Sequence, residues 1–188
     1  MSSHRQVRKN TKDDWQTPSR LFEKLNARFS FTGDACASDL NALCDRFFTE
    51  ETDAIRSDWS KLGCRVFMNP PYSKCHEFMA RAWRAVRDGE VSIVVALVPS
   101  TCEVRWFHEF VLGKASQVWF TKGRVNFVNP DTGSAAQSNV VGSVVVVWDG
   151  ARTGWSNTHM LGLSSKNFEP IGDVAKSLWG DTGQMSLI

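Results

Sequence analysis

The fold class of this chain is decided by one stretch, Val66-Phe67-Met68-Asn69-Pro70-Pro71-Tyr72. Its apolar first three residues predict the end of a buried strand, and the segment from Lys74 to Arg87 predicts a helix with apolar positions at helical spacing. Asn69 is therefore expected at the carboxyl end of a strand. Open α/β sheets bind their ligands at that end of their strands. The stretch predicts an α/β protein with a site at Asn69.

The rest of the chain alternates helices with apolar strands. One helix is predicted from Pro18 along an apolar face that ends near Phe29, and another through Trp106 to about Gly113. Strands are predicted at Phe29 to Thr32, Val91 to Val98, Gln117 to Thr121, Arg124 to Val128 and Val140 to Trp148. This order predicts a three-layer sandwich: a mixed, mostly parallel sheet with helices on both faces and a C-terminal antiparallel hairpin.

Length and composition indicate one domain. The chain has 188 residues, of which 42% are hydrophobic, enough for a single sizeable core. Residues 1–12 are polar and basic and predict a flexible arm, and residues 13–149 carry all the predicted strands. From residue 150 to residue 188 the composition shifts to Gly, Ser, Thr and Asn, which predicts a poorly packed tail.

Charge and cysteine usage exclude several classes of protein. The net charge of +2 neither requires nor excludes a nucleic-acid partner. The five cysteines form no Cys-x-x-Cys pair, and there is no signal peptide or long apolar run, so we expect a reduced cytoplasmic compartment and no membrane. The histidines and cysteines lack metal-ligand spacing, so no metal site is expected. The sequence has no clustered Ser/His/Asp or Cys/His signature, which argues against a hydrolase.

The turn at Asn69 suits one kind of chemistry. The lone pair of an exocyclic amino group on an aromatic ring is delocalised, so its nitrogen is a poor nucleophile until acceptors hold its hydrogens out of conjugation. The side-chain oxygen of Asn69 and the backbone carbonyl of Pro70 form such an acceptor pair. Pro71 stiffens the turn, and Tyr72 offers a flat face for stacking on a base. These four residues are the catalytic candidates.

An ordered set of motifs resembles the phage-type DNA N-6-adenine methyltransferases, a compact Dam-like family. The match covers roughly residues 13 to 149, which would form the methyltransferase domain. Its motifs are Trp15-x-Thr17-Pro18, Asp34-Ala35-Cys36-Ala37, Asp58-Trp59, Asn69-Pro70-Pro71-Tyr72 and Gly123-Arg124-x-x-Phe127. The resemblance implies a Rossmann-like, S-adenosylmethionine-dependent methyltransferase fold.

By the same resemblance S-adenosylmethionine is the methyl donor. Thr17 and Pro18 look like an element that holds its methionine end, and the turn Asp34, Ala35, Cys36, Ala37 faces the same ligand. Asp58 matches the acid that accepts a hydrogen bond from the donor's adenine. Each acid also has a structural alternative, Asp34 as a turn residue and Asp58 as a helix cap, and Thr17 suits a cap as well. There is no Gly-x-Gly turn, and the ribose-binding residue stays open among Asp39, Asn41 and Asp53, with Asn41 favoured.

The resulting hypothesis is direct methyl transfer to a flipped adenine in DNA, in a bacterial cytoplasm if the gene belongs to a phage or prophage. Phe127 is a candidate to close the second face of the base, and Arg124 to bind a phosphate or the base edge. The only candidate recognition insert is Asn129 to Asn139, so the target sequence is not predicted. The oligomeric state stays open between a monomer and a weak dimer.

Two alternatives stay open at this point. Glutamine-directed protein methyltransferases use the same Asn-Pro-Pro-Tyr geometry on an amide nitrogen, although they usually carry a Gly-rich turn where this chain has Asp34 to Ala37. A nucleic-acid-binding relative that has lost catalysis is the other alternative. The intact turn at Asn69 disfavours it.

Overall fold

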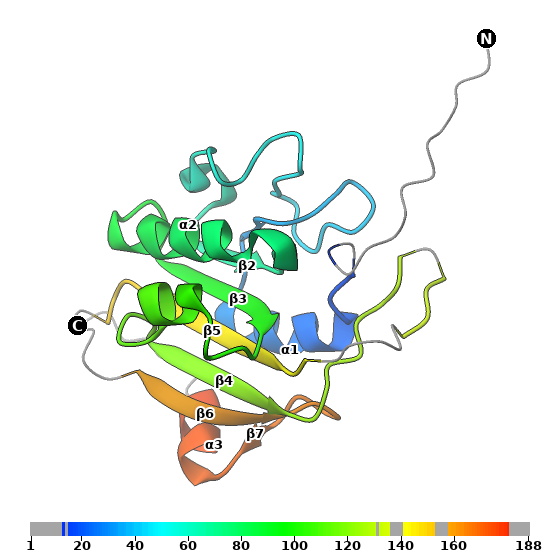
Figure 1. Ribbon diagram of the computed structural model, residues 1–188, viewed down its shortest axis with the longest axis vertical. Coiled ribbons are helices and arrows are strands. Elements are labelled where there is room, and N and C mark those ends of the chain that lie inside the picture. Colours follow the sequence, from blue (N-terminus) through cyan, green and yellow to red (C-terminus); the bar gives the residue numbers. More distant parts are fainter. Residues whose placement is uncertain (1–12, 14, 131, 136–140, 153–157, 181–188) are drawn as a thin grey trace.

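The computed structural model describes residues 13, 15–130, 132–135, 141–152 and 158–180. The predicted arm, residues 1–12, and part of the predicted insert lie outside these residues. The described residues form a seven-stranded sheet with helices packed on both faces (Figure 1). The strands are β1 (Gly33–Asp34), β2 (Arg65–Met68), β3 (Ile93–Pro99), β4 (Gln117–Lys122), β5 (Ser143–Asp149), β6 (His159–Ser164) and β7 (Pro170–Ile171). The helices are α1 (Ser19–Phe29), α2 (Cys75–Arg87), α3 (Asp173–Gly180), the 3-10 turns η2 (Trp59–Leu62) and η3 (Tyr72–Lys74), and the π-helical turn η4 (Phe107–Val111).

The sheet is mixed, with the order β1-β2-β3-β5-β4-β6-β7. The pairs β1–β2, β2–β3 and β4–β6 are parallel, whereas β3–β5, β4–β5 and β6–β7 are antiparallel. The prediction of a mostly parallel sheet is therefore wrong. The reason is the position of β5, which inserts between β3 and β4 and makes both of its pairs antiparallel. The expected C-terminal antiparallel hairpin corresponds to the antiparallel pair of β4 and β5.

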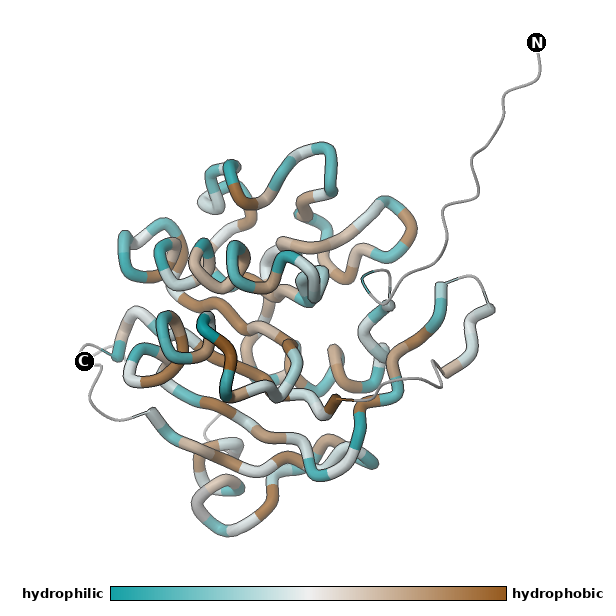
Figure 2. Tube along the Cα trace, viewed as in Figure 1, coloured by the Kyte–Doolittle hydropathy of each residue, from teal (hydrophilic) through white to brown (hydrophobic). Residues whose placement is uncertain are grey.

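The apolar runs of β3 and β5 are buried on both faces of the sheet. Along β3, Val94, Ala96 and Val98 pack on the α2 side, and Ile93, Val95 and Leu97 pack on the α1 side. Successive strand residues point to opposite faces, so an unbroken apolar run fills two cores at once. Figure 2 shows the apolar residues gathered along the central strands and the hydrophilic ones on the outer turns. The expected three-layer arrangement is confirmed.

The first helix ends at Phe29, as predicted, but no strand follows it directly. α1 buries Leu21, Phe22, Leu25 and Phe29 against the sheet. Ser30 then takes a left-handed conformation with φ 51° and donates to the carbonyl of Asn26, while the Asn26 side chain accepts from the backbone N–H of Phe31 at 2.8 Å. These bonds turn the chain out of the helix, so a strand over Phe29 to Thr32 is wrong and pairing begins only at Gly33.

Two further predictions need correction. The segment from Arg124 to Val128 buries Val125 and Phe127 but forms no strand; it contributes only single bridges at Val128, because its backbone pairs with Gln16 instead of the sheet. The segment after residue 150 is not poorly packed where it is described. β6 pairs with β4 over six residues, and Leu163 is fully buried. Within the described residues no helix is long and apolar enough to cross a membrane.

Candidate active site

The turns after β1 and β2 lie side by side at one edge of the sheet. β1 and β2 are parallel neighbours, with Asp34 opposite Phe67, and the N–H of Ala35 donates to the carbonyl of Phe67 at 2.9 Å. Asn69 follows β2 directly, so the topology brings the Asp34 turn next to the Asn69 turn. This is the carboxyl edge, where the sequence predicts the site.

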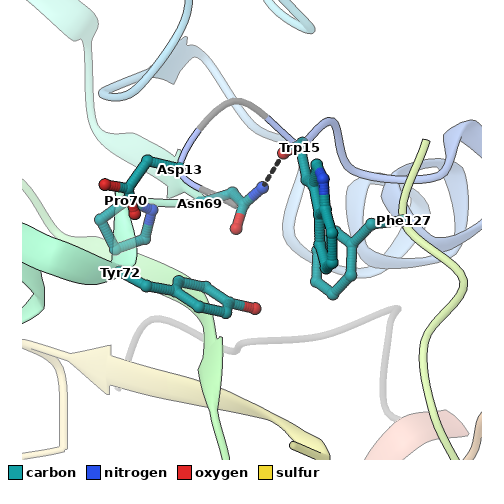
Figure 3. Close-up of a pocket in the computed structure, with 6 residues that line it drawn as sticks. All are labelled: Asp13, Trp15, Asn69, Pro70, Tyr72 and Phe127. Atoms are coloured by element: carbon teal, nitrogen blue, oxygen red, sulfur yellow. Dashed lines mark hydrogen bonds between the residues drawn. The ribbon is translucent and has the colours of Figure 1, made fainter. Parts of the chain in front are cut away.

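A small pocket lies at the Asn69 turn. It is lined by Asp13, Trp15, Asn69, Pro70, Tyr72 and Phe127 (Figure 3). Its volume of about 10 Å³ is close to what a single water molecule needs. Three segments that are far apart in the sequence therefore converge on Asn69, and they leave little space between them.

Three aromatic rings form the walls of this pocket. Trp15 stacks on Phe127 with centroids 6.3 Å apart, and Tyr72 meets the same ring edge-on at 6.4 Å. Phe127 is only 1% exposed, whereas Trp15 and Tyr72 are half-buried. Burial raises the pKa of Tyr72 well above its ordinary value, so its hydroxyl stays protonated at neutral pH. The rings present an apolar, uncharged surface.

The side chain of Asn69 has a defined orientation. Its Nδ2 donates to the backbone carbonyl of Trp15 at 3.2 Å. Figure 3 shows the side-chain oxygen of Asn69 directed into the space between Tyr72 and Trp15. An acceptor therefore faces the pocket and the donor faces the protein.

The segment around Trp15 is itself anchored at two points. A carboxylate oxygen of Asp13 accepts from the backbone N–H of Ser73 at 3.1 Å. Gln16 and Val128 exchange two backbone hydrogen bonds, at 2.9 and 3.0 Å. Sequence reasoning missed both Asp13 and the contact of Trp15. The only signal was that Trp15 belongs to the Trp-x-Thr-Pro motif; nothing in the sequence singled out Asp13.

The Asp34 turn is closed by its own residues. Asp34 is 2% exposed, and its carboxylate accepts from the N–H of Cys36 at 3.0 Å and of Leu43 at 3.5 Å. Burial raises the pKa of Asp34 to about 6, although the two backbone N–H groups oppose the shift. Ala35 is buried, and Cys36 and Ala37 are half-buried. Within the described part of the chain, the Asp34 carboxylate takes part in no salt bridge.

Thr17 and Asn41 differ in how well their side chains are satisfied. Thr17 is 6% exposed, and its Oγ1 has no hydrogen-bond partner within the described part of the chain, although it precedes Pro18, the N-cap residue of α1. An orphaned buried hydroxyl, two positions along the chain from Trp15 of the pocket wall, suits a polar ligand group. Asn41 instead closes a local turn, because its Oδ1 accepts from the backbone N–H and the hydroxyl of Ser38.

Asp58 and Arg124 are not drawn into the pocket. Asp58 is exposed and caps η2 by accepting from the N–H of Ser60 at 2.9 Å. The Ser60 side chain and this backbone N–H together lower the pKa of the Asp58 carboxyl group. Arg124 is exposed directly after Gly123, whose φ of 96° marks a tight turn at the end of β4. Among the described residues no cluster of His, Cys, Asp and Glu is arranged to hold a metal ion.

Comparison with known proteins places this chain in a family. The chain is 27% identical over 170 residues to a DNA N-6-adenine-methyltransferase of Escherichia phage T1, covering 82% of this chain and 70% of that protein. It is 30% identical over 152 residues to the enzyme of the same name from Haemophilus phage HP1, covering 79% and 86%. The solved structure of the Type IIL restriction-modification enzyme MmeI in complex with DNA matches with a TM-score of 0.41 at 13% identity, over 79% of this chain and 23% of that one. The family model of DNA N-6-adenine-methyltransferase (Dam) matches residues 4–173, and the chain belongs to this family.

Proposed function

We propose that this adenine-specific DNA methyltransferase takes its methyl group from S-adenosylmethionine and acts on an adenine flipped out of the duplex, with Asn69 and Pro70 as the acceptors for the amino group. The observation that carries the proposal is the orientation of Asn69, whose Nδ2 is engaged by the Trp15 carbonyl. Family membership supports the substrate class, adenine in DNA.

The acceptors act on the conjugation of the amino group. Two oxygens that accept the amino hydrogens hold them out of the ring plane, which returns electron density to the nitrogen. Positive charge then develops on that nitrogen, and prearranged dipoles stabilise it without reorganising. The side-chain oxygen of Asn69 and the carbonyl of Pro70 are the two dipoles, and Pro71 keeps them fixed because its ring removes backbone freedom.

The aromatic residues would hold the base. Tyr72 stacks on one face of the flipped adenine, and Phe127 closes the other side of the pocket. A base must displace the rings from their present spacing, since the cavity has room for little more than water. Exposed arginines commonly bind DNA phosphates, and we assign this role to the exposed Arg124.

The donor site is assigned to the neighbouring turn and the Thr-Pro element. S-adenosylmethionine supplies a methyl group on a positively charged sulfur. The orphaned hydroxyl of Thr17 and the buried carboxylate of Asp34 suit its polar, cationic methionine end. Pro18, Ala35, Cys36 and Ala37 would line the same side, with Asn41 at the ribose and Asp58 at the adenine. A Rossmann-like arrangement of the first three strands accompanies this assignment.

One experiment tests the proposal directly. Plasmid DNA is recovered from cells that express the protein and is sequenced by a long-read method that detects methylated adenine. The wild-type protein is expected to methylate adenines, and the Asn69→Ala variant to lower turnover by about 10²- to 10³-fold, because one of two acceptors is lost. Isothermal calorimetry with S-adenosylmethionine is expected to give the same affinity for both proteins.

A matched control separates this effect from a loss of folding. Asn167→Ala removes an exposed asparagine in the turn between β6 and β7, where its side chain accepts from the N–H of Glu169. It is expected to methylate like the wild type. Retained turnover in Asn69→Ala, or methylation of cellular protein without methylation of DNA, would contradict the proposal.

A further inference from the structure

Three residues near the N-terminus, Asp13, Trp15 and Gln16, reach the catalytic turn from far away in the sequence, and together we call them the N-terminal strap. Each of the three makes a hydrogen bond to the site. Asp13 binds Ser73, Trp15 binds Asn69, and Gln16 pairs with Val128. The strap therefore connects both sides of the pocket, the Asn69 turn and the segment that carries Phe127 (Figure 3).

The contact of Trp15 decides which end of the Asn69 amide meets the substrate. A primary amide has an acceptor at one end and a donor at the other, and the two ends have nearly the same shape. If the amide turned over, its N–H groups would face the amino hydrogens of the substrate and could accept nothing from them. The backbone carbonyl of Trp15 is only an acceptor, so it binds the nitrogen end and leaves the oxygen towards the pocket.

The contact of Asp13 completes the start of a helix. The first N–H groups of a helix have no partner within it, and a side chain normally caps them. Here the capping position of η3 is Pro71, which has no side-chain acceptor. The carboxylate of Asp13 supplies it from 60 positions away, at 3.1 Å from the N of Ser73. Its negative charge also suits the positive end of the helix that continues into α2.

We propose that the N-terminal strap is a positioning element for methyl transfer, in which Asp13 fixes the helix start and Trp15 fixes the orientation of Asn69. This inference rests on the proposed function of Asn69 as an acceptor. None of the three strap residues reacts with the substrate. They act through the residues that do, and Trp15 also packs its ring on Phe127 at the pocket wall.

The first test uses Asp13 and a spectroscopic probe. Tyr72 is the sole tyrosine, so protein made with 3-fluorotyrosine gives a single ¹⁹F resonance next to the catalytic turn. Asp13→Ala is expected to shift or broaden this resonance and to lower kcat about tenfold, the effect of one lost hydrogen bond to a charged group, with the Kd of the donor unchanged. Asp13→Asn keeps an oxygen acceptor and is expected to restore most of both properties. Asp88→Ala, at the other end of α2 and paired with Arg87, is the control expected to change neither.

The second test reverses the polarity at Asn69. Asn69→Asp keeps an acceptor towards the pocket but places a second oxygen against the Trp15 carbonyl, where a donor is needed. A loss of kcat of about tenfold or more is expected despite the retained acceptor. Wild-type kcat in Asn69→Asp, or wild-type kcat and an unchanged ¹⁹F resonance in Asp13→Ala, would overturn the inference. Both results leave the proposed function standing, which fails separately if Asn69→Ala stays active.

Discussion

The turns after β1 and β2 are neighbours at the same edge, yet they are held in opposite ways. Asp34 binds the N–H groups of Cys36 and Leu43, which are two and nine positions away. Asn69 and Ser73 bind Trp15 and Asp13, which are 54 and 60 positions away. The side-chain bonds of the first turn stay within its own loop. The second depends on a separate segment of the chain.

Because of this difference, the two halves of the site are expected to lose their geometry under different changes. A turn held by local bonds keeps its shape as long as its own loop is folded. A turn held by remote partners loses its geometry when either partner segment moves, because contacts across a long loop carry a larger entropy cost. The half assigned to the donor is thus preformed, and the half assigned to the target base is adjustable.

The largest expected effect is on stability and comes from removing the Phe127 ring, which contacts the two other segments of the pocket. Phe127→Ala removes a 1% exposed ring that contacts both Trp15 and Tyr72, and a loss of about 3–5 kcal/mol in the free energy of unfolding is expected. Urea unfolding measures it. Phe107→Ala, buried on the α2 side, is the matched control. It should lower stability to a similar extent and leave the ¹⁹F resonance of Tyr72 unchanged in the folded protein. A shift of that resonance in the control would break the comparison.

The next effect is a pH dependence that belongs to Asp34. Its pKa in the folded protein is about 6, against an ordinary value of 3.8, because burial disfavours the charged form. The folded state therefore binds more protons than the unfolded state between these values. Stability from this group is complete below about pH 4 and is lost as the pH rises through 6, in total about 3 kcal/mol.

Asp34→Asn isolates this contribution from other titrating groups. The amide oxygen still accepts from the N–H of Cys36 but does not ionise. The difference in unfolding free energy between variant and wild type, measured in urea at several pH values, is expected to change between pH 4 and 6 and to level off above about pH 7. If the unfolding free energies of the two proteins changed with pH in the same way, burial would not be raising the pKa of Asp34.

The smallest expected effect concerns stacking on the target base. Tyr72→Ala removes the half-buried ring, and kcat/KM for DNA is expected to fall by roughly 5- to 150-fold, the equivalent of about 1–3 kcal/mol per stacked base. Tyr72→Phe keeps the ring and is expected to behave like the wild type. DNA with 2-aminopurine at the target position reports the same step by fluorescence. Equal losses in Tyr72→Phe and Tyr72→Ala would assign the effect to the hydroxyl instead.

The layers of the fold were predictable from the sequence because they follow from apolar periodicity. The runs at Val91 to Val98 and Val140 to Trp148 are strands buried on both faces, as expected. Strand direction was not predictable, because side-chain pattern does not tell whether β5 pairs parallel or antiparallel with β3. The segment from Arg124 to Val128 alternates like a strand, yet its partner, Gln16, is decided by tertiary contacts.

The site was predictable where chemistry imposes residue types. Asn69, Pro70 and Tyr72 line the pocket together with Phe127, all four of them predicted site residues. Their roles, like that of Asp58, stay predictions. The contribution of Asp13 was not predictable, since an exposed acid near a basic arm has no distinguishing pattern. Its use as a cap becomes visible only when the helix start that lacks one lies beside it.

The antiparallel insertion of β5 has a consequence for how this scaffold diversifies. β4 runs in the same direction as β2, so the connection from Lys122 to Ser143 leaves the sheet at the edge that carries Asn69 and returns there. Because this connection also carries Phe127 of the pocket wall, we expect its variation to alter the pocket at Asn69 as well as any contact it makes with DNA.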